Sequence, residues 1–266
     1  MLQNRLIIIG KHYKNKIYET SKNKWIIELN GNKLNNWDDF YDIMQKEIDV
    51  ADYNSKFGKG YYTYQDFARD IALLNKVEEK KYEGINIILD YTDKFKIIEG
   101  KEKADIYENI VITMLLEWYR DLRIINKNKN ITIDIKFYIL IDDSNFINKN
   151  FNFTNELIIA IENDKKEIYK RYKDFEFQKI DVKSKKDPDS YIEFKKNEIN
   201  DKFLNQIEKK LSNFGGSKLG ILLFNSEELI WYRKYKLLYI IENILIKRYI
   251  RGQEIHIYLI FNNDIF

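Results

Sequence analysis

Apolar residues recur along the chain at two spacings, and their order predicts an α/β fold. Three segments in the first half have the pattern and length of strands: 24–29, 85–91, which is nearly all apolar, and 131–141, which alternates at first and is then apolar throughout. Apolar residues three and four positions apart predict helices over three further segments: 37–48, 61–74 and 107–125. Such strands are typical of a parallel sheet covered on both faces, and strands joined through helices form right-handed crossovers. We therefore expect a three-stranded parallel sheet packed with helices.

The second half of the chain shows a related order of elements. A polar break, Asp142-Asp143-Ser144-Asn145, follows the third strand, so we expect two domains, at 1–150 and 151–266. Strands and helices are predicted in alternation late in the second domain: 191–194, 200–211, 219–224, 227–249 and 255–261. This is the order of the first domain without its helix at 61–74. We interpret the second, smaller α/β unit as a degenerate copy of residues 24–142.

Shorter patterns complete the assignment. The apolar runs 5–9 and 157–161 fit short strands, and the strongly charged segment 164–173 fits a helix. His256 lies inside the last apolar strand, where a hydrogen-bonded core histidine is expected rather than a functional one.

The composition argues against several classes of function. With 45 basic and 42 acidic side chains, the formal net charge of +3 is too small to indicate direct nucleic-acid binding. Cysteine is absent and only His12 and His256 supply imidazole, which argues against disulfides, histidine-based zinc sites and Ser-His-Asp catalysis. The apolar run 6–9 is too short for a signal peptide or a membrane span. We expect a cytoplasmic protein that does not act at a membrane.

Residues 57–74 carry the most distinctive pattern in the chain. Gly58 and Gly60 permit a sharp turn, and an apolar helical stripe follows: Tyr64, Phe67, Ala68, Ile71 and Leu74. A second stripe holds Tyr62, Asp66 and Asp70, which places two carboxylates one helical turn apart beside a tyrosine. Like charges at this spacing repel by about a few tenths of a kcal/mol, so a helix that carries them for a purpose would bind a cation. The alternative is a solvated acidic face.

These features resemble the barstar family, the intracellular inhibitors of barnase-type ribonucleases, over residues 24–142. The resemblance rests on a first strand and turn, an aromatic-glycine turn, an acidic second helix and two later strands: 26–31, 57–58, 66–71, 87–91 and 133–141. Asp66 matches the second aspartate of the family's second helix. The sequence departs from the family's pattern at two positions: Gly60 replaces the usual asparagine, and Tyr62 replaces the first aspartate. The resemblance implies a barstar-like fold for this half.

The resemblance also implies a function: an immunity protein that plugs the active site of a nuclease toxin, most simply a ribonuclease. Such an active site is concave and cationic because it holds phosphate, so carboxylates on a helix can occupy its phosphate subsites. Asp66 would be the central anion and Asp70 the second. The implied surrounding contacts come from the helix, the loop before it and a later helix: Tyr61, Tyr62, Gln65, Tyr53, Phe57 and Asp121. For each aromatic residue, packing in the core is the alternative.

Two other functions fit the same residues. Asp66, Asp70 and Asp90 are the natural ligands of a Mg²⁺-dependent enzyme acting on phosphate substrates, since Mg²⁺ needs only one or two carboxylates plus substrate phosphates. A glycine-rich phosphate loop of the usual spacing and a histidine base near these residues are both lacking. The third function is an adaptor that kept the fold and lost the nuclease, which Tyr62 leaves open. We expect the inhibitor, without enzymatic activity, cofactor or metal.

Overall fold

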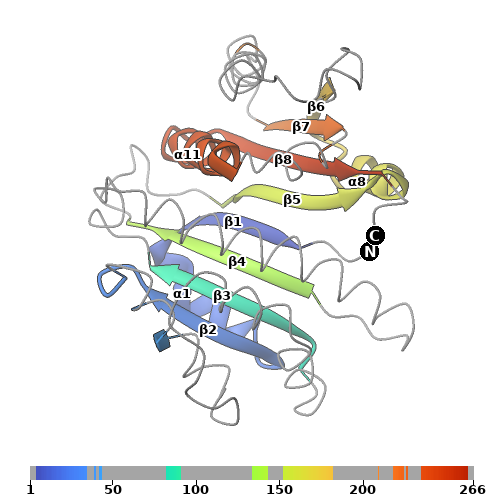
Figure 1. Cartoon of the computed structure of the whole chain (residues 1–266). Coiled ribbons are helices and arrows are strands. Elements are labelled where there is room, and N and C mark those ends of the chain that lie inside the picture. The colour runs from blue at the N-terminus through green and yellow to red at the C-terminus, as the bar shows by residue number, and fades with distance from the viewer. Residues whose placement is uncertain are drawn as a thin grey trace, which may run out of the picture. The chain divides into compact units, whose positions relative to one another are not determined.

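The structure is a computed structural model that describes part of the chain: residues 4–34, 39, 42–43, 82–90, 134–142, 152–181, 209, 218–224, 226 and 235–262. The chain divides into two compact units, Met1–Thr154 with Phe266, and Asn155–Ile265 (Figure 1). Within the described ranges, no helix combines the length and the apolar composition that a membrane span requires.

Among its described residues the first unit has four strands, and each strand runs parallel to its neighbours. Its elements in chain order are β1 (Arg5–Gly10), the 3-10 helix η1 (Lys11–Tyr13), α1 (Lys14–Glu19), β2 (Lys24–Asn30), β3 (Gly84–Asp90) and β4 (Asp134–Ile141). The strand order in this unit is β2-β3-β4-β1. The three predicted strands and their parallel arrangement are confirmed. The strand predicted at 5–9 is confirmed as β1, and because it pairs with β4 along its whole length, the predicted three-stranded sheet has a fourth strand.

The part of the second unit that the structure describes also has four parallel strands. Its elements are β5 (Asn155–Ile161), the 3-10 helix η5 (Glu162–Asp164), α8 (Lys165–Arg171), β6 (Glu176–Asp181), β7 (Lys218–Phe224), α11 (Tyr235–Ile250) and β8 (Glu254–Phe261). The order is β5-β8-β7-β6. The predicted strands at 157–161, 219–224 and 255–261 and the helix at 164–173 are confirmed. Strand β6 was not predicted, and the strand expected at 191–194 and the helix at 200–211 lie outside the described residues, apart from Lys209.

The two units share one topology and one register. In each unit the first strand pairs with the fourth, the second with the third and the third with the fourth. Arg5 lies opposite Lys136 in the first unit, and Glu156 lies opposite His256 at the equivalent place in the second. The repeat therefore begins at β1 and β5, and the counterpart of β2 is β6 rather than the segment at 191–194.

The amino-acid sequences of the two units agree with this correspondence of strands. Residues 4–30 and 155–181 align without a gap, and eight positions are identical: Asn4/Asn155, Leu6/Leu157, Ile7/Ile158, Ile8/Ile159, Lys14/Lys165, Ile17/Ile168, Tyr18/Tyr169 and Lys22/Lys173. The buried clusters beneath α1 and α8 also correspond. The first contains Ile7, Ile9, Ile17, Ile88, Tyr138 and Leu140, and the second contains Ile158, Ala160, Ile168, Leu222, Tyr258 and Ile260. The two units are thus two copies of one structural plan.

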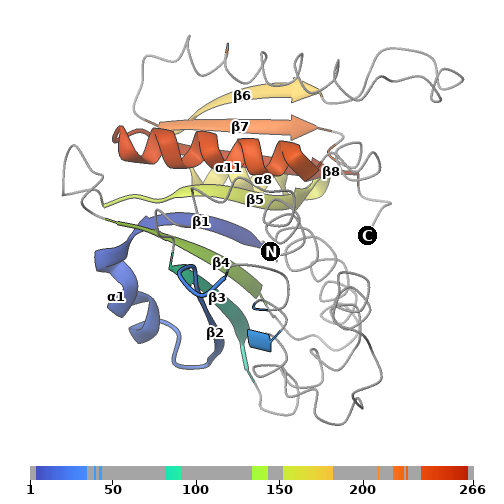
Figure 2. The same cartoon turned by 60° about the vertical axis from the view of Figure 1, so that its left-hand side comes forward.

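Helices lie on both faces of the strands of the second unit (Figure 2). Ile168 of α8 packs with the side chains of one face, whereas α11 contacts β5 and β8 on the other. The end of α11 is closed by Gly252 at φ 78°, where the backbone N–H of Gly252 donates to the carbonyl of Tyr249 at 2.9 Å. This turn leads directly into β8. Coverage on both faces explains why β5 and β8 are buried along nearly their whole length.

Candidate functional site

The predicted partner-binding residues are not among the described residues. They are Tyr53, Phe57, Tyr61, Tyr62, Gln65, Asp66, Asp70 and Asp121. Their roles therefore stay predictions. The strands on either side of the acidic segment are described, since β2 ends at Asn30 and β3 begins at Gly84.

Asp90, the third carboxylate of the metal hypothesis, lies at the carboxyl end of β3. The Lys11 ammonium contacts its Oδ1 at 2.9 Å, so this carboxylate already has a cationic partner. Within the described ranges, no group of three or more His, Asp or Glu side chains is arranged to hold a metal ion.

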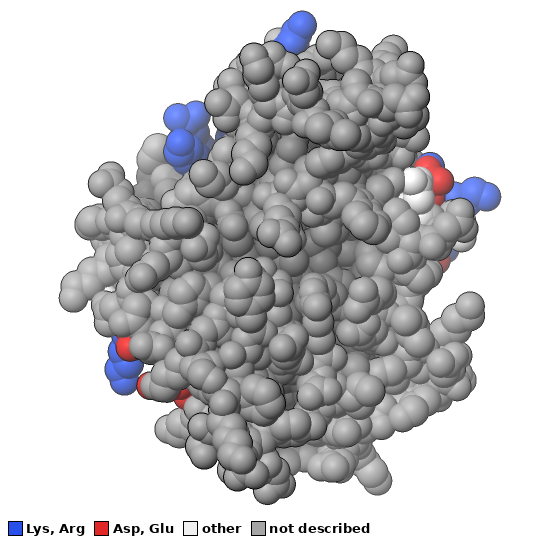
Figure 3. Space-filling view, viewed as in Figure 1, with Lys and Arg blue, Asp and Glu red and all other residues white. Residues whose placement is uncertain are grey.

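Other polar pairs lie near the same edge of the first sheet. Lys14 Nζ contacts Glu28 Oε2 at 3.1 Å, and the Tyr18 hydroxyl donates to the same carboxylate. These side chains are partly exposed, so each ion pair contributes about 0–1 kcal/mol. Basic and acidic side chains also lie beside one another among the described residues at the lower left and the right of Figure 3.

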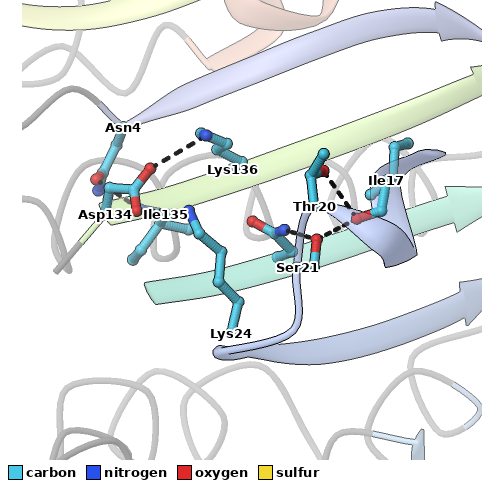
Figure 4. Close-up of polar contacts among 9 residues, drawn as sticks. Asn4, Ile17, Thr20, Ser21, Lys24, Asp134, Ile135 and Lys136 are labelled. Atoms are coloured by element: carbon cyan, nitrogen blue, oxygen red, sulfur yellow. Dashed lines mark hydrogen bonds and ion pairs between the residues drawn. The ribbon is translucent and has the colours of Figure 1, made fainter. Parts of the chain in front are cut away.

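A second polar group, hereafter the basic cluster, lies at the amino ends of the strands and consists of Arg5, Lys24, Asp134 and Lys136. Lys24 Nζ contacts Asp134 Oδ1 at 2.8 Å, and Lys136 Nζ lies 3.5 Å from Asp134 Oδ2 (Figure 4). Arg5 lies opposite Lys136 in the register. The cluster thus holds three cationic side chains and one carboxylate, and the lysines come from two different strands.

Gly84 makes the Lys24–Asp134 contact possible. It separates Lys24 from Asp134 in the register of the sheet. A Cβ atom at this position would lie 2.6 Å from both the backbone and the side-chain oxygen of Asp134 and 3.4 Å from Lys24 Nζ. Only glycine leaves the space through which the lysine reaches across β3.

The pKa of Lys136 is lowered from its ordinary value. Burial is the main cause, because it disfavours the charged ammonium. Asp134 acts in the opposite direction, while the positive charges of Lys24 and Arg5 lower the pKa further. One carboxylate does not offset the burial of Lys136 and the neighbouring cations.

A chain of buried polar groups adjoins the basic cluster. Asn86 Nδ2 donates to the hydroxyl of Ser21 at 2.6 Å, and that hydroxyl donates to the carbonyl of Ile17 (Figure 4). The side chain of Asn4 is also buried, and its Oδ1 accepts the backbone N–H of Ile135 at 3.2 Å. Asn155 makes the equivalent bond to Ile255 in the second unit, at 2.8 Å. This shared bond ties the first strand of each unit to the fourth.

The second unit has aromatic rings where the first has the basic cluster. Phe175 replaces Lys24, Tyr172 replaces Ser21 and His256 replaces Lys136. The imidazole of His256 is 2% exposed, and its centroid lies 4.5 Å from that of Phe175 and 4.9 Å from that of Tyr172. The Tyr258 hydroxyl lies 3.4 Å from His256 Nδ1. His256 is therefore a core histidine, as predicted.

Glu254 lies two residues before His256 on β8, and its pKa is raised from the ordinary value of 4.5. Burial is the main cause; Asp174 and Glu156 add to it, while Lys218, 3.7 Å away, acts against it. The folded state therefore retains the proton at a higher pH than the unfolded state. The resulting stabilisation is fully present below about pH 4.5 and is lost as the pH rises through the folded-state pKa.

We accordingly expect the Glu254→Gln variant to gain free energy of unfolding relative to the wild type as the pH rises from 4 towards 7. Urea denaturation at several pH values measures this difference. Glu167→Gln, on the exposed face of α8, is the control and should show no such trend. A flat difference for Glu254→Gln would contradict the assigned cause.

No family model matches the sequence, and no characterised protein or solved structure is significantly similar to it.

Sequence reasoning missed the basic cluster, although the strands contain a signal. Asn86 interrupts an otherwise apolar run, and Asp134 and Lys136 alternate with apolar residues at the start of β4. Period-two alternation places such polar residues on one face of a sheet. The signal identifies the face, but it does not show that Lys24 lies across from Asp134.

Proposed function

We propose that this chain is a binding protein of the inhibitor class: an immunity protein that plugs the active site of a nuclease toxin, most simply a ribonuclease. The contact surface is the acidic face predicted for the helix at 61–74. Asp66 and Asp70 occupy positions that the toxin uses to hold phosphate. Tyr61, Tyr62 and Gln65 surround them.

One observation carries the proposal. Strands β2, β3 and β4 are consecutive in the chain, adjacent in the sheet and parallel. A run of three such strands is the framework that the barstar-like resemblance implies. Residues 31–83, which hold the acidic pair, join the carboxyl end of β2 to the amino end of β3. Strand β1 and the whole second unit are additions to that framework.

The test is capture of a nuclease on immobilised full-length protein, followed by an activity assay before and after release of the bound nuclease. We expect the captured nuclease to show no nuclease activity while it is bound to the column and to regain that activity once it is released. The Asp66→Ala change should weaken this complex by about 3–5 kcal/mol, because it leaves a buried cation of the toxin unpaired. Raised salt should mainly slow association.

The double variant Asp66→Ala/Asp70→Ala is compared with a matched control. The control carries Glu19→Ala and Glu167→Ala, which remove two exposed carboxylates on α1 and α8 and change the net charge by the same amount. The control should capture the nuclease as the wild type does. Equal capture by the wild type, the control and the Asp66→Ala/Asp70→Ala variant would refute the acidic face as the inhibitory site, as would loss of folding without a specific loss of binding.

A further inference from the structure

Two lysine side chains of the basic cluster converge on one carboxylate from two strands (Figure 4). Lys24 reaches across Gly84 and makes the closer contact, with its Nζ 2.8 Å from Asp134 Oδ1. Lys136 Nζ lies 3.5 Å from Asp134 Oδ2, which is longer than the about 2.7–3.2 Å of an ordinary N–H···O hydrogen bond. Lys136 is therefore the less well compensated of these two lysines.

The surroundings of Lys136 favour its neutral amine. Its side chain is only 23% exposed, and the ammonium of Lys24 approaches the same carboxylate. Burial is the largest cause that lowers the pKa of Lys136, and the charges of Lys24 and Arg5 lower it further, while Asp134 acts in the opposite direction. Only the neutral amine carries a reactive electron pair, so a lysine that is desolvated and lies beside another cation is an activated nucleophile.

The exposure that remains suits attack by a small reagent. Lysine side chains bury their methylene stem along a protein surface and keep the nitrogen towards water. Lys24, Gly84 and Asp134 lie opposite one another in the register, and the first two of these strands begin there. The cluster thus lies at the amino ends of the strands, where the lysine nitrogens meet the rim of the sheet.

The second unit has a lysine at the equivalent edge, in the opposite surroundings. Lys218 begins β7 as Gly84 begins β3. It contacts two carboxylates, those of Asp174 and Glu254, and the second lies 3.7 Å away. The hydrogen bond to Asp174 is the largest cause that raises the pKa of Lys218. The Lys218 side chain is 39% exposed, so accessibility favours reaction at Lys218, whereas the surrounding charges favour reaction at Lys136.

We propose that Lys136 is a reactive amine that forms a Schiff base with small aldehydes. The electron pair of the neutral nitrogen attacks the carbonyl carbon and a C–N bond forms, while the nitrogen gives up a proton and the carbonyl oxygen takes one. Loss of water from this carbinolamine gives the imine, so the step needs neither an oxidant nor a reductant. A protonated imine keeps a positive charge beside Asp134, whereas acylation of the nitrogen would remove it. This site is independent of the acidic face.

Competitive labelling of the folded full chain tests the assignment. The chain is treated at pH 7 with acetaldehyde and sodium cyanoborohydride, which reduces each imine to a stable secondary amine, and peptide mass spectrometry follows the individual lysines over time. Lys136 should be labelled at least about tenfold faster than Lys218, because each unit of pKa changes the fraction of neutral amine about tenfold. In urea the two rates should become equal, since unfolding removes both sets of surroundings.

Two variants change the charges around Lys136 in opposite directions. Lys24→Met removes a cation and should slow the labelling of Lys136 about threefold or more, whereas Asp134→Asn removes the counterion and should accelerate it about threefold or more. Lys11→Met, at the carboxyl ends of the strands, is the control and should leave this rate unchanged. The wild-type comparison of Lys136 with Lys218 stands even if a variant fails to fold. Labelling of Lys136 no faster than Lys218, or a difference that persists in urea, would overturn the proposal.

Discussion

Replacement of Tyr258 by alanine is expected to lower the free energy of unfolding by about 3–5 kcal/mol. This ring is fully buried in the second unit, where it packs with Ile158, Leu222 and Ile260. Its centroid lies 6.0 Å from that of Phe177. Removal leaves a cavity that the sheet cannot close, because strands on both sides hold β8 in register. Urea denaturation of the full chain, followed by circular dichroism, measures the loss.

Tyr258→Phe is the control for this change. It keeps the ring and removes only the hydroxyl near His256, so it should cost about 1 kcal/mol or less. If the two variants were equally destabilised, the stabilisation would come from the hydroxyl and not from packing of the ring.

Asn155→Ala is expected to destabilise the chain by about 2–4 kcal/mol. The side chain is 0% exposed and joins three elements, because Oδ1 accepts from the Ile255 amide and Nδ2 donates to the carbonyl of Leu245 in α11 at 2.9 Å. Alanine leaves one buried donor and one buried acceptor with reduced bonding, each at about 1–3 kcal/mol. Denaturation measures the total loss, and hydrogen exchange at the Ile255 amide, which should accelerate, reports the local bond.

Asn152→Ala provides the comparison, since the exposed side chain of Asn152 accepts a solvent-exposed bond from the Tyr13 hydroxyl in the first unit. It should change stability by less than about 1 kcal/mol. Unchanged exchange at Ile255 in the Asn155→Ala variant would show that this amide has another acceptor. The bond to Asn155 Oδ1 would then not explain the loss of stability.

The strands were predictable where burial on two faces makes the sequence continuously apolar. Strands β3, β7 and β8 read this way. Strand β6 was missed because it is an edge strand that carries Glu176, Gln178 and Lys179, and so it lacks an apolar run. The partner of β1 was not predictable, because its four apolar residues do not specify which of the distant strands they will join.

The basic cluster was less accessible to sequence reasoning than the strands were. Lys24 and Asp134 are separated by more than a hundred positions, and only the register of three strands brings them together. The acidic helix was interpreted from the spacing of nearby residues, and helical periodicity can be recognised in the sequence. Asp66 and Asp70 lie outside the described residues, so their face remains a prediction for the capture experiment to decide.

The matched register of the two units gives this protein an internal reference. Strand residues of one unit have counterparts at equivalent sheet positions in the other, and both experience the same solvent, temperature and expression level. Exchange of counterparts, such as Lys136 for His256 or Asn86 for Gly220, separates what the architecture tolerates from what a binding site demands. Most single-domain proteins need a distant homologue for that comparison, whereas this chain contains both versions.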